Sequence, residues 1–232
     1  MLTISDSTVA GNGVVGVCFD PGLPICGQMF LGGGGILNGG TMVISNSTLA
    51  SNYTALARGA KTGSSGEGAA IYNYGNVAII NNSTLSGNTA TYAGGIYNAS
   101  GSLKLQNSIV ASNGLPNCSG TVTSDGYNLS GDNTCNLTGS GDLTNANPLL
   151  GPLQNNGGTT QTMALLAGSP AVDAGNPSGC TDGQDNLLTT DQRGMPRPDP
   201  EDKRGCDMGA YESQSNETPT QTPTATPRRH QH

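Results

Sequence analysis

Charged side chains are scarce in this sequence, and basic ones most of all. Asp, Glu, Lys and Arg make up 11% of the 232 residues, with nine basic residues against sixteen acidic ones. An ordinary soluble domain has about 25%. Nucleic acids need clustered Lys and Arg to neutralise their phosphates, so this balance argues against a nucleic-acid partner. Apolar runs are also short, and none reaches the roughly 18 residues that a transmembrane helix needs.

Large apolar residues are few as well. Leu, Ile, Val and Phe together account for 40 of the 232 residues, which is below the level of about 20% at which disorder becomes the expectation. Disorder also requires a high net charge, however, and the formal charge is only -7. The polar residues are mainly Ser, Thr, Asn and Gly, which form turns and hydrogen-bonded ladders. The composition therefore predicts one or two compact domains with many turns.

Six cysteines are present, and none belongs to a CxxC pair. An even number without that spacing favours disulfides over a zinc site or a thioredoxin-type site. Six buried free thiols are the alternative. Disulfides would imply an oxidising, extracellular compartment. The favoured pairs are those adjacent in the sequence, namely Cys18 with Cys26, Cys118 with Cys135, and Cys180 with Cys206.

The first residues carry no secretory signal. Met1 is followed at once by Leu2-Thr-Ile-Ser, with neither a basic nor an apolar region. Because residues 2–12 already belong to the repeat described next, we expect a truncated chain that lacks its signal peptide.

One block of eleven residues occurs four times without a gap. Its final Asn residues are 40, 36 and 25 residues apart, so segments of different length separate the copies. A second shared element, centred on Ile36, Ile71 or Ile96, precedes the last three blocks. Repeats of about 25 residues predict a solenoid. The four copies are LTISDSTVAGN from Leu2, MVISNSTLASN from Met42, AIINNSTLSGN from Ala78 and LKLQNSIVASN from Leu103.

Apolar residues alternate within each block over runs too short for helices, as in Leu2 and Ile4. This pattern predicts short β-strands. A polar residue follows each apolar pair, and in three copies it is Asn: Asn46, Asn82 and Asn107. Because Asn tolerates left-handed backbone and can stack its amide on the next copy, this column predicts an Asn ladder at one bend of a parallel β-helix. The Ser and Thr columns that follow could contact ordered water or glycans.

Two insertions interrupt the repeats, at residues 13–31 and 54–67. The second carries Arg58, Lys61 and Glu67. Insertions in a solenoid become loops on one side of the stack, so we expect recognition there. Tolerated surface loops without a function are the alternative.

Glycine-rich elements at 34–36 and 94–96 accompany apolar-x-x-Asn elements at 49–52, 85–88 and 110–113. This pairing resembles the repeats of bacterial polymorphic outer-membrane proteins and other right-handed parallel β-helix surface proteins. The resemblance implies a pectin-lyase-like solenoid, all-β and right-handed, at the surface of a bacterium.

Residues 117–212 carry a second set of motifs, which are NCSGTVTSDGYNLSGDNTC, DLTNANPLLGPLQNNGGTTQTMALLAGSPAVDAGNP, TTDQRGMPRP and CDMGAYE. Together they resemble the choice-of-anchor Q domain, found at the end of β-helix regions in secreted bacterial proteins. Repeated prolines in this stretch suit a cap that blocks further strand pairing. We therefore predict β-helix coils over 1–142, a capping region over 143–212 and a disordered Thr/Pro-rich linker over 213–232.

Candidates for catalysis are few. Both histidines, His230 and His232, lie in the tail, which leaves no His base, His-metal centre or Ser-His-Asp triad in the domain. A polygalacturonase-like site would need paired carboxylates on adjacent coils, and the four blocks contain a single acid, Asp6. We therefore expect no catalytic residue.

Three acids near Cys180 could hold Ca²⁺ through oxygen ligands: Asp182, Asp185 and Asp191. The alternative is a set of solvated loop acids, with Asp191 paired to Arg193. No other cofactor is predicted.

The sequence thus predicts a non-catalytic, monomeric, extracellular or cell-surface protein. It would be an adhesin-like structural scaffold that contacts surface glycans or a host or neighbouring cell surface. The alternative is a fragment of a polysaccharide lyase or glycoside hydrolase whose active coils lie upstream of Met1.

Overall fold

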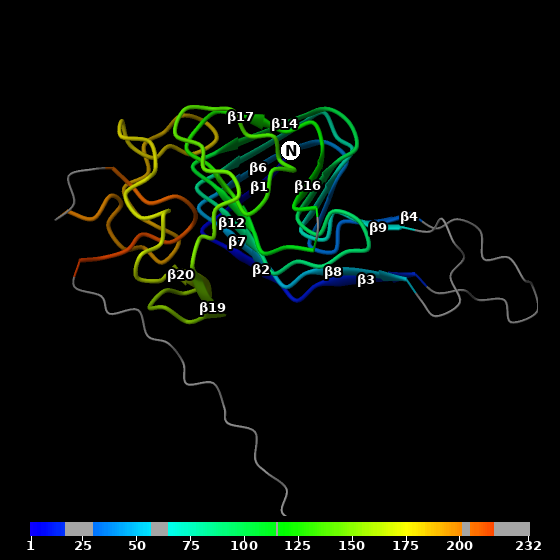
Figure 1. Ribbon diagram of the computed structural model, residues 1–232, viewed down its shortest axis with the longest axis horizontal. Helices are drawn as coiled ribbons and strands as arrows, with labels where there is room; N and C mark the ends of the chain where they lie inside the picture. The colour runs from blue at the N-terminus through cyan, green and yellow to red at the C-terminus, as the bar shows by residue number, and fades with distance from the viewer. Residues whose placement is uncertain (17–29, 57–64, 115, 201–204, 216–232) are drawn as a thin grey trace, which may run out of the picture.

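The computed structural model describes residues 1–16, 30–56, 65–114, 116–200 and 205–215 (Figure 1). Within these ranges the chain forms twenty β-strands and no helix. The predicted all-β class is therefore confirmed. In the same ranges, no helix has the length and apolar character needed to cross a membrane.

Most strands belong to three parallel sheets. The first consists of β1 (Leu2–Ser5), β6 (Thr41–Ser45), β11 (Val77–Asn81), β14 (Ser102–Gln106) and β17 (Thr123–Ser124). The second consists of β5 (Ile36–Asn38), β10 (Ile71–Asn73), β13 (Ile96–Asn98) and β16 (Cys118–Gly120). The third consists of β2 (Thr8–Ala10), β7 (Thr48–Ala50), β12 (Thr84–Ser86), β15 (Ile109–Ala111) and β18 (Leu129–Ser130).

Three strand pairs complete the described structure. Two are parallel and lie at the bases of the two insertions: β3 (Gly13–Gly16) with β8 (Tyr53–Leu56), and β4 (Phe30–Gly32) with β9 (Ser65–Glu67). The third is antiparallel and joins β19 (Leu150–Gln154) to β20 (Thr162–Leu165).

The chain enters the three parallel sheets in a fixed order. β5, β6 and β7 lie in the second, first and third sheets, and β10 to β12, β13 to β15 and β16 to β18 repeat that order. Each residue pairs with its counterpart in the aligned block, as shown by the column Ile4, Ile44, Ile80 and Leu105. The gapless alignment of the four blocks is therefore the register of the sheets.

A left-handed residue joins the first sheet to the third in every repeat. Asp6, Asn46, Asn82 and Asn107 have φ angles of 48°, 52°, 46° and 49°. Asn and Asp reach this region more readily than other non-glycine residues because their short polar side chains form local hydrogen bonds. The predicted bend is confirmed at all four positions.

Apolar side chains from the three sheets form the core of the repeats. They pack in columns, and each column carries one residue per repeat. Removing this surface from water is the main favourable contribution to folding. The fully buried large members include Met42, Ile44, Leu49, Ile71, Ile80, Leu85, Ile96, Leu103 and Leu105.

An asparagine ladder runs beside this core. It consists of Asn12, Asn52, Asn88, Asn113 and Asn117. Each Oδ1 accepts the backbone N–H and the side-chain N–H of the Asn before it, at 3.0 and 2.9 Å for the step to Asn88 and 3.1 and 2.8 Å for the step to Asn113. Buried amides are thus satisfied by the same group in the next repeat.

Residues 131–143 take the place of a further repeat after β18. The backbone N–H of Asn117 donates to the Asp132 carboxylate at 3.1 Å, which ends the asparagine ladder. Leu137 enters the core, and Cys135 forms a disulfide with Cys118 across a separation of 17 residues. Closing a loop of that size stabilises a fold by about 3 kcal/mol in the chain-entropy model.

The chain after residue 143, which we call the lateral chain, packs along the side of the repeats. Gln192 donates through Nε2 to Thr8 Oγ1 at 3.0 Å and accepts from Thr48 Oγ1 at 2.6 Å. Further along, the Ala210 N–H donates to Thr84 Oγ1 at 3.1 Å. Figure 1 shows the yellow to orange chain beside β7 and β12. The predicted capping region over 143–212 therefore makes these contacts on a lateral face, whereas residues 131–143 follow the last strands.

Replacing a core leucine tests the apolar columns. Leu85→Ala removes a fully buried side chain, and we expect the free energy of unfolding to fall by about 2–5 kcal/mol in guanidinium titrations. The matched control is Leu187→Ala, because Leu187 is 61% exposed, and its effect should stay within about 0.5 kcal/mol. Equal losses in the two variants would contradict the assignment of the core.

The asparagine ladder makes a second prediction. Asn88→Ala removes the acceptor of the Asn52 N–H and a donor to the carbonyl of Leu49, and should lower the free energy of unfolding by about 2 kcal/mol. Asn12→Ala, at the exposed end of the same ladder, should cost less than half as much. Thermal and denaturant melts of both variants measure the difference, and a larger loss at Asn12 would disprove the ladder's role.

Candidate functional site

The predicted Asn column at the first bend does not form a continuous ladder. Asn107 donates to Asn82 at 3.1 Å and Asn46 donates to Asp6 at 2.7 Å, but the Nδ2 of Asn82 donates to the Thr181 carbonyl. Bonds to the lateral chain thus interrupt the predicted stack. The continuous ladder belongs to the Asn that ends each block, which the repeat alignment already contained.

The Ser and Thr columns were predicted to contact ordered water or glycans, but from the second repeat on they are buried. Ser47 and Ser83 are fully buried, and the backbone N–H of Ser47 donates to Ser83 Oγ at 3.3 Å. Thr48 and Thr84 are also buried, because the chain around Gln192 and Ala210 covers them. This face is an internal interface.

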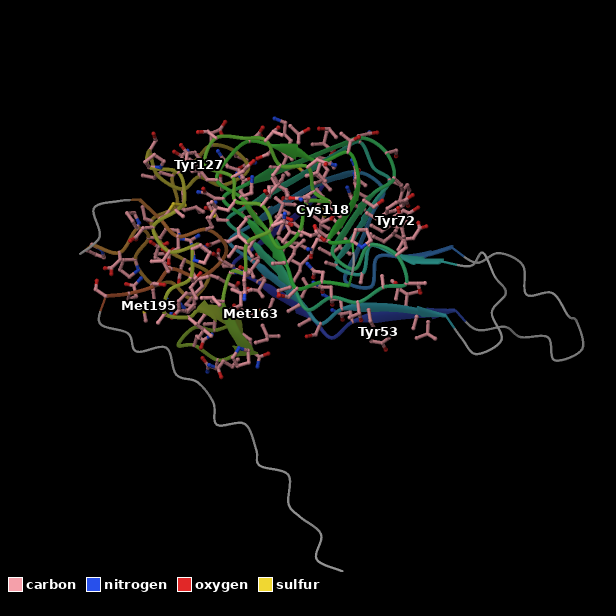
Figure 2. The ribbon with its side chains drawn as sticks, viewed as in Figure 1. Tyr53, Tyr72, Cys118, Tyr127, Met163 and Met195 are labelled. Atoms are coloured by element: carbon pink, nitrogen blue, oxygen red, sulfur yellow. A yellow bond between two sulfur atoms is a disulfide. The ribbon has the colours of Figure 1, made fainter. Side chains whose placement is uncertain are left out.

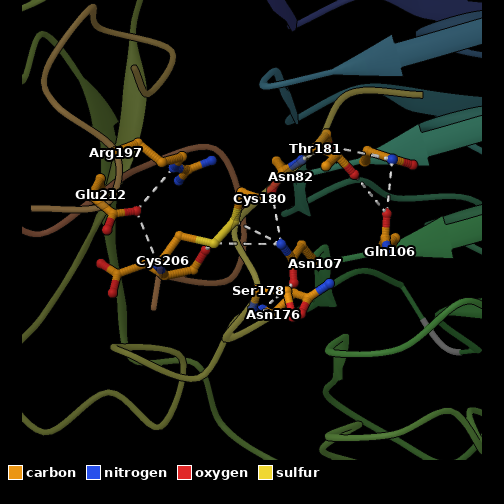
Figure 3. The surroundings of a disulfide bond; sticks show 12 residues. Asn82, Gln106, Asn107, Asn176, Ser178, Cys180, Thr181, Arg197, Cys206 and Glu212 are labelled. Atoms are coloured by element: carbon orange, nitrogen blue, oxygen red, sulfur yellow. Dashed lines mark hydrogen bonds and ion pairs between the residues drawn. A yellow bond between two sulfur atoms is a disulfide. The ribbon is translucent and has the colours of Figure 1, made fainter. Parts of the chain in front are cut away.

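The second described disulfide lies at the same interface (Figure 3). Cys180 bonds Cys206 across 26 residues, and the side-chain amide of Asn107 donates to the sulfur of Cys180. The Asn107 Oδ1 accepts the N–H of Asn176 at 2.9 Å. Two of the three predicted pairs are therefore confirmed. The third pair, Cys18 and Cys26, lies outside the described residues, as do Arg58 and Lys61.

The three candidate Ca²⁺ ligands have separate roles. Asp182 is a turn residue whose carboxylate accepts the side-chain amide of Asn186 at 3.0 Å and the backbone N–H groups of Gln184 and Asn186 at 2.8 and 3.0 Å. Desolvation raises the pKa of Asp182, but these hydrogen bonds outweigh it and the pKa is lowered. Asp185 lies in the same turn with a φ of 62°. Asp191 is buried and pairs with Arg193. Among the described residues no group of three His, Cys, Asp or Glu could hold a metal ion.

Asp191 and Arg193 form a buried ion pair in the lateral chain. Their Oδ2 and Nε atoms are 2.8 Å apart, and neither side chain is exposed. The guanidinium also lies 3.8 Å from the ring centroid of Tyr211 and donates to the Glu212 carbonyl at 2.6 Å. The pairing of Asp191 with Arg193 that the sequence suggested as the alternative is present.

The second buried pair ties the lateral chain to the repeats. Arg197 Nε donates to Glu212 Oε2 at 2.9 Å, and its Nη1 donates to Asn46 Oδ1 at 3.1 Å. The N–H of Asp207 also donates to Glu212 Oε2, at 3.0 Å. Burial raises the pKa of Glu212 to about 7: Arg197 opposes the rise and Asp207 adds to it. Burial raises the pKa of Asp207 as well.

A cavity of about 470 Å³ lies next to this network. Its lining contains no titratable side chain, and its members are Leu165, Leu166, Ala167, Gly168, Ser169, Val172 and Ser213. The carboxyl groups with raised pKa values thus do not line the cavity. They hold the lateral chain together and, through Arg197, bond it to Asn46 of the repeats.

Four tyrosines gather at the second sheet, away from the lateral chain; Tyr72 and Tyr97 lie on its strands and are half-buried. Tyr74, Tyr72, Tyr97 and Tyr92 form a continuous line, which we call the tyrosine row. Successive ring centroids are 6.2, 5.1 and 6.1 Å apart, with interplanar angles of 60°, 53° and 72°. Tyr74 and Tyr92 are 52% and 45% exposed. Figure 2 shows Tyr72 on the side of the molecule opposite Met195.

Backbone register and small residues position the row. Tyr72 and Tyr97 pair directly across β10 and β13, so their side chains point to the same face. The ring of Tyr72 lies over Gly32, and the hydroxyl of Tyr74 lies over Gly39. A Cβ atom on either glycine would collide with the tyrosine above it. Glycine at these two positions leaves the space that the rings occupy.

A carboxylate adjoins the row. Glu67 ends β9, and its backbone forms a bridge with Tyr92. Burial is the first cause that raises the pKa of Tyr72 and of Tyr97, and the negative charge of Glu67 is the second for both. The phenols therefore stay neutral hydrogen-bonding groups. At the other side Ser119 Oγ donates to Tyr92 Oη at 3.2 Å.

The tyrosine row is the strongest candidate site among the described residues. Tyrosine combines a large apolar face with a polar tip, which suits ligands that are partly apolar and partly hydroxylated. The sequence prediction placed recognition on the insertions but missed these rings. The signal was the second shared element, IYNYG and GGIYN, where Tyr72 and Tyr97 hold the same aligned position.

Comparisons with protein-family models, with curated proteins and with solved structures find no match.

The buried carboxyls predict an unusual pH dependence. The pKa of Glu212 in the folded protein, about 7, exceeds its ordinary value of 4.5, so its contribution to stability is complete below 4.5 and is lost as the pH rises through about 7. Asp207 acts in the same direction. Denaturant titrations should therefore show stability falling from about pH 4.5 to about pH 7 and levelling off above that range.

The variant Glu212→Gln should flatten that decline, because the amide does not ionise, even if it lowers stability at every pH. Asp125→Asn removes an exposed carboxylate that pairs with Lys104 and serves as the control. An unchanged slope in Glu212→Gln would refute the assignment.

Proposed function

We propose that this protein is a non-catalytic, extracellular or cell-surface scaffold that contacts glycans through the tyrosine row. Its repeats form a right-handed parallel β-helix of the pectin-lyase-like kind. Residues 143–212 correspond to the choice-of-anchor Q-like region. The role is adhesin-like: a rigid stack of repeats presents a binding surface.

The β-helix proposal draws support from the sheet topology. Three parallel sheets whose strands recur in one fixed order are what a coil of three strands per turn produces. The in-register asparagine ladder has the same periodicity. Two disulfides in the described residues agree with an oxidising compartment.

The observation that carries the glycan proposal is the gathering of four tyrosines, two exposed and two half-buried, in one continuous line. The whole chain has seven tyrosines and two phenylalanines. Exposed apolar side chains scattered singly need no explanation, but a contiguous set marks an interaction surface. Sugars offer C–H faces to aromatic rings and hydroxyls to phenols and to groups such as Ser119. Their chemistry therefore matches the row.

The insertions border this surface. Gly32 at the end of β4 lies under the ring of Tyr72, and a Cβ on Gly68, next to β9, would come within 3.0 Å of Tyr97. The described bases of both insertions thus frame the row. This placement links the sequence-based expectation of recognition loops to the tyrosines.

The double variant Tyr72→Ala/Tyr97→Ala tests the proposal. On an array of neutral and charged polysaccharides, the oxidised wild-type protein should bind at least one glycan, and the double variant should lose about tenfold or more in affinity, since stacking contributes about 1 kcal/mol per ring. Tyr53→Ala is the matched control, because Tyr53 is 40% exposed and lies on β8, over Gly13 and outside the row.

The same samples, incubated with the polysaccharides and assayed for new reducing ends and unsaturated products, test the non-catalytic part. Cleavage would replace the scaffold proposal with the lyase or hydrolase alternative. Equal binding by the wild type and the double variant would remove the tyrosine row as the site.

A further inference from the structure

The two central rings of the tyrosine row are neighbours in adjacent repeats. Tyr72 and Tyr97 pair directly across the parallel strands β10 and β13, and their ring centroids are 5.1 Å apart with an interplanar angle of 53°. Adjacent strands are about 4.8 Å apart, so the two side chains run side by side away from the sheet. Equivalent atoms of the two phenols therefore lie opposite each other, including the ring carbons next to the hydroxyl groups.

The outer contacts of the row differ from this central one. Tyr74 follows Tyr72 by two residues, and Tyr92 precedes Tyr97 by five, so each outer contact joins two residues of one repeat and does not match equivalent atoms. Their centroid distances are longer, at 6.2 and 6.1 Å. Tyr74 and Tyr92 are also the most exposed rings of the row, at 52% and 45%. The row thus has accessible ends and a matched central pair.

We propose that Tyr72 and Tyr97 are an oxidative modification site, at which a one-electron oxidant couples the two phenols into dityrosine. A peroxidase with hydrogen peroxide is the class of oxidant that this reaction needs. Each phenol loses one electron and its hydroxyl proton. The two radicals then join through a carbon–carbon bond between the ring carbons next to the hydroxyls, and the hydrogens of those carbons move to the oxygens. Hydrogen peroxide takes up the two electrons and two protons and becomes two molecules of water.

Proximity favours coupling within this pair. Holding two reactants in contact and in a fixed orientation replaces a chance encounter by a step within one molecule, which strongly raises their effective concentration. The accessible ends of the row admit the oxidant. A radical formed on Tyr74 or Tyr92 takes a hydrogen atom from the central phenol that its ring contacts, and the oxidation thereby reaches the half-buried pair. The cross-link would join β10 to β13, and it does not depend on the glycan function.

Peroxidase treatment of the full chain, with its disulfides intact, tests the proposal. The product should be a monomer that has lost two hydrogen atoms in mass and shows dityrosine fluorescence. After unfolding and digestion next to Leu85, which lies between the two tyrosines in the sequence, the fragments that carry Tyr72 and Tyr97 should remain linked. The yield should stay constant over about tenfold dilution of the protein, because the reaction is intramolecular.

Conservative variants identify the pair without removing any ring. Tyr97→Phe should lower the fluorescence by about tenfold or more, since phenylalanine has no hydroxyl hydrogen to lose and the positioned partner is gone. Tyr53→Phe is the matched control and should leave the yield unchanged, because Tyr53 is 40% exposed but lies outside the row. Tyr74→Phe/Tyr92→Phe should slow the reaction and leave the same two residues linked.

Three results would overturn the proposal. The first is undiminished fluorescence in Tyr97→Phe. The second is a product made only of linked chains, whose yield rises with protein concentration. The third is a cross-link that contains Tyr53 in place of Tyr72 or Tyr97. An unchanged rate in Tyr74→Phe/Tyr92→Phe would overturn the role of the outer rings.

Discussion

Hydrogen bonds between neighbouring repeats are the interaction on which the rest of this structure depends. The chain has few large apolar residues, so each repeat buries only a narrow set of columns. The asparagine ladder and the Ser column supply the remaining specificity, since in both columns a side-chain oxygen accepts an N–H from the same column in the neighbouring repeat. A shift of register by one residue would leave all of these groups unpaired at once, at a cost of several kcal/mol.

The lateral chain and the tyrosine row divide the outer surface between them. Thr48 and Thr84 belong to the third sheet, and the segment around Gln192 covers them. The second sheet keeps its outer face open, and the aromatic residues are there. The lateral chain, with its buried ion pairs and its disulfide, thus covers the third sheet. The tyrosine row lies at the second sheet.

Sequence reasoning predicted the elements that are local or periodic. The four blocks defined the register of Ile4, Ile44 and Ile80, and Asn at the first bend followed from its tolerance of left-handed backbone. Periodicity could not show which of the two Asn columns forms the continuous ladder, however, because only the fold decides which column points inward. Thr84 was expected at the surface, since nothing in the repeat indicates which face a distant segment covers. Tyr72 and Tyr97 were aligned but not recognised as stacked.

The direct pairing of Tyr72 with Tyr97 has a consequence for how such a surface can change. Their centroid spacing of 5.1 Å is close to the distance of about 4.8 Å between adjacent strands, so the backbone sets the spacing of this central step of the row. Duplication of a repeat that carries Tyr72 or Tyr97 would add a ring in phase with the existing ones, whereas the same position holds Leu37 and Ser119 in the flanking repeats. The valency of the surface would then grow by whole steps, and its affinity for a polymeric ligand would increase by avidity without any new type of contact.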